Sequence, residues 1–330
     1  MWIWAIAIVI IGLCLDLLVG EPPRKIHPVA WMGKLISVID KRIPRNQKYI
    51  EIFAGITLCL IIILTFTVCF TAILAFIRNI FGVIPWIVAS SIVFKVMFAV
   101  RDMKEHVLPI INYVDKGDLD AARDALKAIV SRDVKNLDRR HILSASIESI
   151  AENTVDSILS PLMYLGISGV PLTITYRAVN TLDAMVGYKN RRYINVGFAS
   201  AKLDDILNWL PARLCVIFML LSSFILGKYK HYPITTIIRD ASKHESPNSG
   251  LPISTMAWIL NTKLEKIGYY SVGPSHLPND TKYLFDALKV METTWILFTI
   301  FICIPLYALF GIHIQIFLED LIFNMILSVV

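Results

Sequence analysis

The feature that most constrains the fold of this chain is the length of its uncharged apolar runs. Ile52–Ile77 and Thr293–Leu318 contain no Asp, Glu, Lys or Arg. A helix needs about 20 such residues to cross the hydrocarbon core of a bilayer. Charged residues make up 18% of the chain, against roughly 25% in ordinary soluble domains, and the 56% share of hydrophobic residues excludes an intrinsically disordered chain. The sequence therefore predicts an integral membrane protein with sizeable polar loops.

Four membrane spans are predicted from clear apolar runs, and two further segments allow two interpretations. The four lie near residues 1–19, 52–77, 79–100 and 293–318. Residues 157–176 are uncharged but contain Pro and Gly, which favours either a full span or a re-entrant segment. Residues 209–227 are long enough only if the end that contains Arg213 joins the helix. We expect an all-α, polytopic integral membrane protein with about four to six transmembrane helices and polar helical loops, forming a single membrane-embedded domain over residues 1–330.

The basic residues indicate how the first half of the chain is oriented. Gly20–Ile50 holds seven Lys and Arg against two acidic residues, and short cytoplasmic loops are enriched in Lys and Arg. We therefore expect this loop and Arg101–Ala151 on the cytoplasmic side of a multi-pass protein of the cell membrane. The net charge of +6 is spread over the loops, so it predicts a lipid bilayer, and no nucleic acid, as a partner.

Three carboxylates recur at four-residue spacing just before the segment 157–176. They are Glu148, Glu152 and Asp156. On an α-helix this spacing places them along one face, where like charges repel unless a cation lies against them. Hard cations such as Mg²⁺ prefer carboxylate oxygens. The pattern predicts a Mg²⁺ site or an ammonium-binding site, and the alternative is a solvated acidic face.

A second polar stretch combines an amide, a carboxylate and several cations. Asn180 and Asp183 are three residues apart and share a helix face. Lys189, Arg191 and Arg192 follow closely. A carboxylate beside Lys and Arg suits a phosphorylated ligand, because guanidinium and ammonium groups bind phosphate oxygens. The alternative is a basic loop of the kind that orients a membrane protein.

Two further stretches place reactive side chains next to apolar helices. Asp205 and Arg213 lie at the start of the apolar run that ends near residue 227, and an Arg in such a run is costly unless it is paired. It either belongs to a site or extends to a lipid headgroup. Lys243, His244 and Asn248 lie in a turn-rich segment. His244 is a candidate general base because its ordinary pKa is near neutrality, and the alternative is a solvated loop residue.

Taken together, four sequence blocks resemble the adenosylcobinamide-phosphate synthase (cobinamide synthase) family of membrane proteins from cobalamin biosynthesis. The blocks are LDLLVGEPPRKIHPVAWMGKLI from Leu15, ESIAENTVDSILSPLMY from Glu148, YRAVNTLDAMVGYKNRRY from Tyr176 with AKLDDILNWLPARL from Ala201, and DASKHESPNSGLPISTMA from Asp240. They occur in the order and spacing of the family. Glu21 departs from the Asp that is usual there, Ile253 stands where many members have an acidic residue, and Gly268–Asp280 match loosely.

The resemblance implies a ligase that forms an amide bond. The family joins a propionate carboxylate of adenosylcobyric acid to aminopropanol or its O-phosphate, and the product is adenosylcobinamide or its phosphate. A carboxylate is a poor electrophile, so the resemblance also implies ATP as a cosubstrate, activation through an acyl phosphate, and Mg²⁺ with the ATP. Other enzymes of cobalamin assembly are possible partners of such a protein.

The residues identified above fit this implied chemistry. Glu148, Glu152 and Asp156 are predicted to hold Mg²⁺ or the amine, with Asp183 as a further carboxylate in catalysis. His244 and Asp205 are the two candidates for removing the proton from the attacking amine. The predicted substrate and phosphate ligands are the remaining polar residues, Asn180, Lys189, Arg191, Arg192, Arg213, Lys243 and Asn248.

Two other functions remain open from the residues alone. A Mg²⁺-dependent membrane prenyltransferase would use Asn180 and Asp183 for a diphosphate, although Asp204 and Asp205 are a poor second acidic motif. A small-molecule transporter would use Asp16, Lys95 and Arg213 as charges along a pathway, although transport sites lie near the bilayer midplane.

Overall fold

Helices form most of the described chain, and the longest apolar ones match the predicted spans. A computed structural model describes residues 1–45, 47–228 and 234–328. Six helical segments in it are long and apolar enough to cross a membrane. They are Trp2–Val19, Lys48–Phe81, Val83–Asp115, Arg139–Val186, Phe198–Ile225 and Lys282–Leu327. The prediction of an all-α polytopic membrane protein is confirmed, and both segments that allowed two interpretations lie in such helices.

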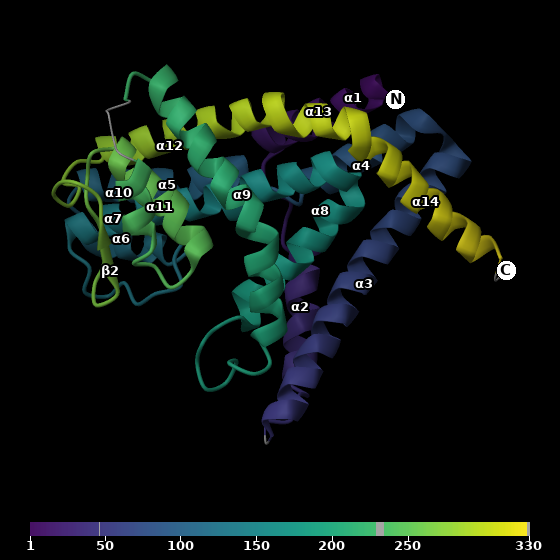
Figure 1. The fold of residues 1–330 in the computed structure, drawn as a ribbon, viewed down its shortest axis with the longest axis horizontal. Helices are drawn as coiled ribbons and strands as arrows, with labels where there is room; N and C mark the ends of the chain where they lie inside the picture. The colour runs from purple at the N-terminus through teal and green to yellow at the C-terminus, as the bar shows by residue number, and fades with distance from the viewer. Residues whose placement is uncertain (46, 229–233, 329–330) are drawn as a thin grey trace. The chain divides into compact units, whose positions relative to one another are not determined.

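The chain divides into two compact units, which we describe separately. Unit 1 comprises Met1–Ala99, Ser160–Leu207 and Thr299–Val330, and unit 2 comprises Val100–Leu159 and Asn208–Phe298. Figure 1 labels the helices of both. The prediction of a single membrane-embedded domain stays a prediction.

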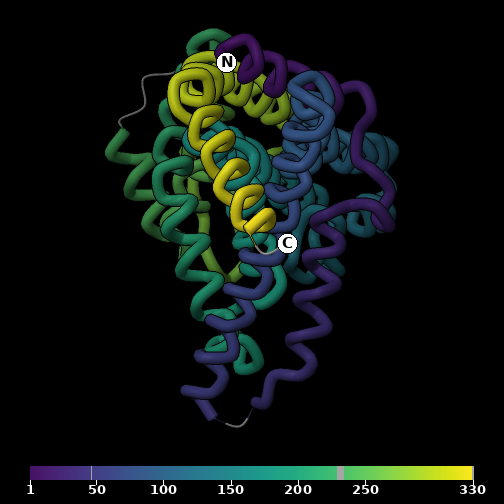
Figure 2. Tube along the Cα trace, turned by 90° about the vertical axis from the view of Figure 1, so that its right-hand side faces the viewer, coloured from purple at the N-terminus to yellow at the C-terminus, as the bar shows by residue number. Residues whose placement is uncertain are grey.

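Unit 1 is built around two long helices, α3 (Lys48–Phe81) and α8 (Ser160–Val186), which pack against each other. The other elements of unit 1 are α1 (Trp2–Val19), α2 (Pro28–Asp40), α4 (Val83–Lys95), the start of α9 (Phe198–Ile225), the π-helix η2 (Thr299–Cys303), α13 (Ile304–Leu306), the π-helix η3 (Tyr307–Gly311) and α14 (Ile312–Leu327). In Figures 1 and 2, α2 and α3 run side by side. The short helix α2 begins where His27 accepts a hydrogen bond from the backbone of Val29 and Pro28 takes the first helical position.

A break divides α8 inside its apolar stretch. Ser168 and Gly169 have non-helical backbone angles, and the φ of Gly169 is +72°, a conformation that favours glycine. The break leaves the backbone N–H of Val170 without a helical acceptor, and Oε1 of Gln315 from α14 accepts it at 3.0 Å. Irregular backbone at membrane depth requires such a partner, because lipid offers none.

A largely buried polar network continues from Gln315 through unit 1. The Tyr307 hydroxyl donates to Gln315 at 2.7 Å, and the amide of Gln315 donates to Glu319 at 3.0 Å. Trp86 donates to the same carboxylate at 2.9 Å, and Arg78 is paired with it at 3.2 Å. The network therefore places a donor from α4 and a cation from α3 beside a buried carboxylate on α14.

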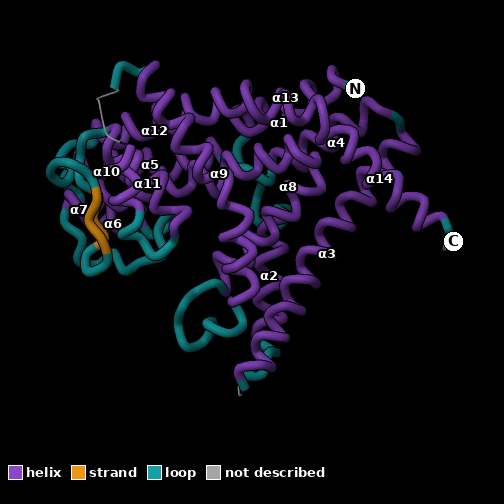
Figure 3. Tube along the Cα trace, viewed as in Figure 1, coloured by secondary structure: helices purple, strands orange, loops and turns teal. Residues whose placement is uncertain are grey.

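Unit 2 is a helical body with one small hairpin. Its helices are α5 (Val100–Asp115), α6 (Leu119–Leu126), α7 (Arg139–Asn153), the π-helix η1 (Thr154–Leu159), the remainder of α9, α10 (Ile234–Ala241), α11 (Pro247–Ile259) and α12 (Lys282–Phe298). Strands β1 (Leu264–Lys266) and β2 (Tyr270–Val272) pair antiparallel, with Glu265 opposite Ser271, and are drawn in orange in Figure 3. Helix α7 packs against α11, α12 and β1.

Side-chain caps explain where several helices of unit 2 begin. Asp118 accepts from the backbone of Ala121 at the start of α6, and Asp138 accepts from His141 at 2.9 Å at the start of α7. Ser246 precedes Pro247 at the start of α11 and accepts from Ser249. These residues satisfy backbone donors that a helix start leaves open. The loop between α10 and α11 therefore ends at the capped start of α11.

Candidate functional site

The residues predicted from the sequence fall into one group in each unit. Unit 2 contains Glu148, Glu152, Asp156, Arg213, Lys243, His244 and Asn248. Unit 1 contains Asn180, Asp183, Lys189, Arg191, Arg192 and Asp205.

In unit 2, Glu148 is the centre of a buried polar cluster, which we call the Glu148 cluster (Arg132, Ser144, Glu148, His244 and Tyr270). The Ser144 hydroxyl donates to Oε1 of Glu148 at 2.8 Å, and the Tyr270 hydroxyl donates to Oε2 at 2.6 Å. Nη1 of Arg132 lies 3.2 Å from the same Oε2. Both carboxylate oxygens are therefore engaged, and the side chain is only 7% exposed.

His244 joins this cluster through its ring. The centroids of the His244 and Tyr270 rings are 3.7 Å apart. Nε2 of His244 is buried and has no hydrogen-bond partner among the described residues. Burial, together with the nearby Lys266 and Lys243, lowers the pKa of His244 to about 4. The ring is therefore neutral near pH 7, and it has little affinity for a proton.

Asp240 organises the segment that carries His244. Its carboxylate accepts from Nζ of Lys243 at 2.7 Å, from the Trp258 ring at 2.9 Å and from the backbone of Gly273 at 3.1 Å. Burial alone would raise the pKa of Asp240, but these hydrogen bonds outweigh it and hold the pKa below its usual value. Lys243 thus already has a carboxylate partner.

Arg213 and Asn248, both predicted as ligand-binding residues, contact each other. Nη1 of Arg213 donates to Oδ1 of Asn248 at 2.9 Å and to the carbonyl of Trp209 at 2.8 Å. The guanidinium carbon lies 4.5 Å from the centre of the Trp209 ring. Arg has five donors in a planar fork, so this arrangement orients the group and leaves donors for a ligand.

The three carboxylates predicted on one α-helical face are not arranged that way. Helix α7 ends at Asn153, and Asp156 lies in the π-helical turn η1. Thr154 donates to the carbonyl of Ile150 at 2.7 Å, and Ser157 donates to the Asn153 side chain at 2.9 Å. Side-chain hydrogen bonds of this kind compete with the regular helical ladder. The expected α-helical register therefore fails at Asp156.

The residues do not form a ready three-ligand metal site. Within the described part of the chain, no group of three or more His, Cys, Asp or Glu side chains could hold a metal ion. Glu148 is buried and bound by protein donors, whereas Glu152 is exposed and Asp156 is partly buried. Glu148 therefore does not fit a Mg²⁺ ligand in this arrangement, and the metal role of Glu152 and Asp156 stays a prediction.

In unit 1, Asn180 bridges α8 and α9. Nη1 of Arg177 donates to Oδ1 of Asn180 at 3.3 Å, and Nδ2 of Asn180 donates to Asp204 at 3.4 Å. The Tyr164 hydroxyl on α8 donates to the carbonyl of Leu207 at 2.7 Å, which holds the start of α9 against α8. The amide of Asn180 is thus oriented by two charged neighbours.

The remaining predicted residues of unit 1 lie near the end of α8, in the loop that follows it and in the first part of α9. Asp183 and Asp205 are partly buried, whereas Lys189 and Arg191 are exposed. Arg192 is paired with Asp40 at the end of α2, with Nη2 3.0 Å from Oδ2. Arg192 therefore has a protein partner already, while the roles of the other four stay predictions.

Two of the three charges that suggested a transport pathway, Asp16 and Lys95, lie in one cluster in unit 1. Nζ of Lys95 lies 2.9 Å from Glu21 and 3.8 Å from Asp16. His27 contacts the other oxygen of Glu21 at 2.6 Å. The cluster ties α1, the loop after it and α4 together, so a structural role accounts for these charges.

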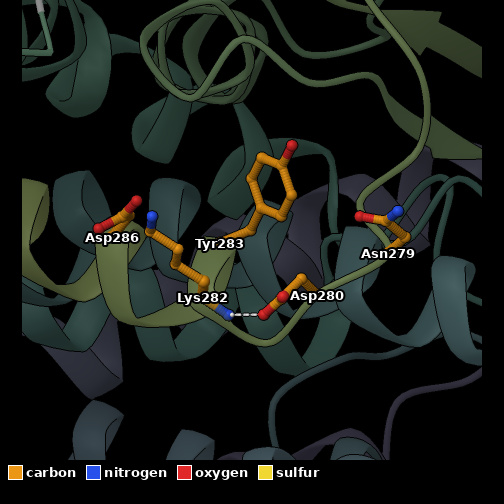
Figure 4. A pocket seen from close by; sticks show the side chains of 5 residues that line it. All are labelled: Asn279, Asp280, Lys282, Tyr283 and Asp286. Carbon is orange, nitrogen blue, oxygen red and sulfur yellow. Dashed lines mark hydrogen bonds between the residues drawn. The ribbon is translucent and has the colours of Figure 1, made fainter.

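A separate pocket of about 350 Å³ opens at the start of α12 in unit 2. Figure 4 shows the residues that line it, Asn279, Asp280, Lys282, Tyr283 and Asp286. Its lining includes none of the residues predicted from the sequence. Asp286 is paired with Lys228 at 2.6 Å, so the negative charge of this lining residue is already compensated by a lysine.

Four residues that hold the predicted ones were not predicted from the sequence. Tyr270 and Arg132 bind Glu148, Asp240 binds Lys243, and Arg177 binds Asn180. Tyr270 lies in the loosely matching loop, 122 positions from Glu148, and no local pattern pairs the two. Arg177 could have been identified from the sequence, because it is a charged residue at one end of an apolar run, as Arg213 is.

Comparison with known proteins agrees with the sequence resemblance. The model of the family described as "CobD/Cbib protein" matches residues 9–312. The "Probable cobalamin biosynthesis protein CobD" of Methanocaldococcus jannaschii is 37% identical over 304 residues, which is 89% of this chain and 95% of that protein. The "Cobalamin biosynthesis protein CobD" of Clostridium perfringens is 39% identical over 266 residues, which is 79% of this chain and 83% of that protein.

A third relative extends the same picture to another organism. The "Cobalamin biosynthesis protein CobD" of Dehalococcoides mccartyi is 36% identical over 272 residues, covering 82% of this chain and 87% of that protein. No solved structure matches the chain. The family match covers most of the chain and includes the residues of both groups. The chain belongs to the CobD/Cbib family.

Proposed function

We propose that this protein is an enzyme of cobalamin biosynthesis that forms adenosylcobinamide or its phosphate. In this proposal it joins a propionate carboxylate of adenosylcobyric acid to the amine of aminopropanol or aminopropanol phosphate. The observation that carries the proposal is that two of the sequence blocks resembling the family, those that begin at Glu148 and Asp240, meet in the Glu148 cluster. Glu148 of one block is bound by Tyr270, whose ring lies against His244 of another.

The reaction needs activation of the carboxylate, and ATP is the proposed source. A carboxylate oxygen attacks the γ-phosphorus, giving an acyl phosphate and ADP. The amine nitrogen then attacks the acyl carbon, phosphate leaves, and the nitrogen loses a proton. Mg²⁺ would neutralise phosphate charge, and such ions are commonly held by one or two carboxylates together with substrate phosphates. Glu152 and Asp156 are the proposed carboxylates, since Glu148 is already bound by protein donors.

The protein's own groups supply binding and proton transfer in this scheme. Arg213 is oriented by Asn248 and Trp209, and we assign it to an anionic oxygen of a substrate. Lys189 and Arg191 are exposed and are proposed as further phosphate ligands.

The pKa of His244 bears on its protonation state and does not choose between the candidate bases. A pKa of about 4 leaves the ring neutral near pH 7, with one nitrogen as a donor and the other as an acceptor. We propose His244 or Asp205 as the group that takes the proton from the attacking amine, with Asp183 as a further carboxylate in catalysis. A cytoplasmic location of these loops would give them access to ATP.

The test is an assay of the purified protein. The detergent-purified protein is incubated with adenosylcobyric acid, aminopropanol phosphate or aminopropanol, ATP and Mg²⁺, and the corrinoid is followed by mass spectrometry. We expect an ATP-dependent mass gain equal to the amine minus water. Glu152→Gln and Asp183→Asn should each reduce the rate, whereas Asp124→Asn, on the exposed surface of α6, should not. A folded protein that binds no corrinoid would overturn the proposal and return attention to prenyl transfer or transport.

A further inference from the structure

Arg177 is a charged residue in an apolar helix, and no carboxylate of the described residues forms an ion pair with it. It lies on α8, within the candidate span Arg139–Val186. Its Nε is buried and makes no hydrogen bond among the described residues. The bond from Nη1 to Oδ1 of Asn180 is 3.3 Å long, near the upper limit for such a bond.

Other cations at comparable positions in unit 1 are paired with acidic groups. Lys95 lies within 4.0 Å of Glu21 and Asp16, and Arg78 pairs with Glu319 and Asp320. Over the described ranges, Arg177 makes no ion pair of this kind. A cation in an apolar segment is costly unless it is paired, and such residues often mark functional sites.

The surroundings of Arg177 hold it in place on α8. Asn180 presents its carbonyl to Arg177 and its amide to Asp204, so Asn180 separates the guanidinium from the Asp204 carboxylate. The neighbouring Tyr176 ring stacks on Tyr164 with centroids 5.2 Å apart, which fixes this part of α8. Within the part of the chain that the structure describes, one of the five guanidinium donors is used by a side chain, and the others can bind two oxygens of a carboxylate or phosphate together.

We propose that Arg177 binds an anionic oxygen group, a phosphate or carboxylate, of a soluble substrate. The inference deepens the proposed function and rests on it for the identity of that substrate, which would be the nucleotide, the phosphorylated amine or the corrinoid acid. Arg177 is then a binding residue, and the ligand supplies the counter-charge that the protein omits. A lipid headgroup could present the same chemistry, so the test separates the two sources.

The test uses the full-length protein in nanodiscs of phosphatidylcholine, with inorganic phosphate and pyrophosphate as probes. Thermal unfolding is measured against probe concentration. We expect both probes to stabilise the native protein, and Arg177→Gln to weaken the apparent affinity at least tenfold. Arg177→Lys should retain part of the affinity, because it keeps the charge and loses the planar fork. Arg101→Gln, whose partner is Glu105 on the surface, is the control and should bind as the native protein does.

Unfolding without any probe separates binding from a structural role. If the charge is uncompensated, Arg177→Gln should have the same Tm as the native protein or a higher one. Arg78→Gln, which breaks an existing pair, should have a lower Tm. A drop in Tm for Arg177→Gln comparable to that for Arg78→Gln, or unchanged probe affinity in Arg177→Gln, overturns the proposal.

Two further readouts distinguish the possible failures. If neither probe stabilises the native protein, while phosphatidylglycerol nanodiscs raise its Tm and not that of Arg177→Gln, the anion is a headgroup and the proposal is wrong. Probe binding does not require turnover. A native protein that binds phosphate through Arg177 but forms no amide therefore refutes the proposed function and supports the anion site.

Discussion

The hydroxyl of Tyr270 donates a 2.6 Å hydrogen bond to Oε2 of Glu148. The bond joins the small hairpin of unit 2 to α7. Without it, Oε2 of the buried Glu148 carboxylate would face only Arg132. Burial and the negative charge of Glu148 raise the pKa of Tyr270 above its usual value. The hydroxyl therefore remains a donor throughout the physiological pH range.

Replacing Tyr270 by Phe should destabilise unit 2 with little change in volume. A hydrogen bond to a charged group contributes about 1.5–3 kcal/mol, so we expect a loss of about that size. Thermal and denaturant unfolding of the purified protein measure it. Tyr269→Phe is the matched control, because Tyr269 is 67% exposed. Equal stabilities of the two variants would show that the Glu148 bond contributes nothing.

The lowered pKa of His244 predicts a pH dependence of stability. The unfolded ring titrates near 6.5 and the folded ring at about 4, so the unfolded state binds more protons between these values. The contribution of the neutral ring is fully present above pH 6.5 and is lost as the pH falls toward 4. His244→Gln removes this titration. Relative to that variant, the native protein should lose about 2–3 kcal/mol between pH 7.5 and pH 4.5.

Unfolding of both proteins over this pH range measures the difference. Carboxylates elsewhere in the chain also titrate between pH 7.5 and pH 4.5. Their contribution is common to the native protein and the variant, so it cancels in the difference. A stability difference that stays constant from pH 7.5 to pH 4.5 would contradict a buried neutral ring.

The backbone break in α8 should not tolerate a side chain at Gly169. The positive φ of Gly169 costs an Ala about 1–2 kcal/mol, and an added Cβ would lie 2.6 Å from Cβ of Gln315. We expect Gly169→Ala to lower the Tm strongly or to prevent accumulation of folded protein. Gly227→Ala is the control, because Gly227 has a φ of +64° and open space around its Cα.

The comparison separates backbone strain from the contact with Gln315. Gly227→Ala should show only the cost of the positive φ. Should Gly169→Ala lose no more stability than Gly227→Ala, the close approach of Gln315 would have no energetic weight.

The contact between Asn248 and Arg213 should control substrate binding. Asn248→Leu removes the side-chain acceptor of Arg213, and we expect kcat/KM for amide formation to fall about 10–100-fold, the effect of losing 1.4–2.8 kcal/mol of transition-state stabilisation. Asn248→Asp keeps an acceptor oxygen and should retain much more activity. Asn279→Leu, at the exposed pocket of α12, serves as the control. Equal activity in the Leu and Asp variants would remove Asn248 from the site.

The extent of the membrane helices could be predicted from the sequence because apolar length is a local property. The segments 157–176 and 209–227 became helices once their polar ends were included, as the runs Arg139–Val186 and Phe198–Ile225 show. In the sequence, only the Gly and Pro residues of this segment indicate a break in the helix. Its shape depends on Gln315, 145 positions from Val170, and no local pattern contains that contact.

The sequence predicts which residues belong to the candidate site, but it does not predict which of them contact one another. Arg213 was identified because a charge in an apolar run requires compensation, but its partner Asn248 is 35 positions away. The carboxylate face failed because Asn153, Thr154 and Ser157 redirect the helix into a π-helical turn. Helix periodicity alone assumes a regular ladder, so it could not anticipate that change.

The polar network around Gln315 has a consequence for how helices recognise one another in lipid. Apolar helices gain little from burying one face rather than another, because lipid tails are as apolar as their side chains. Rotating α14 by one residue would bring Ile314 or Ile316 to the broken backbone at Val170 and leave its N–H and the hydroxyl of Tyr307 without an acceptor. One glutamine therefore selects a single azimuth for α14 among many that apolar packing would accept.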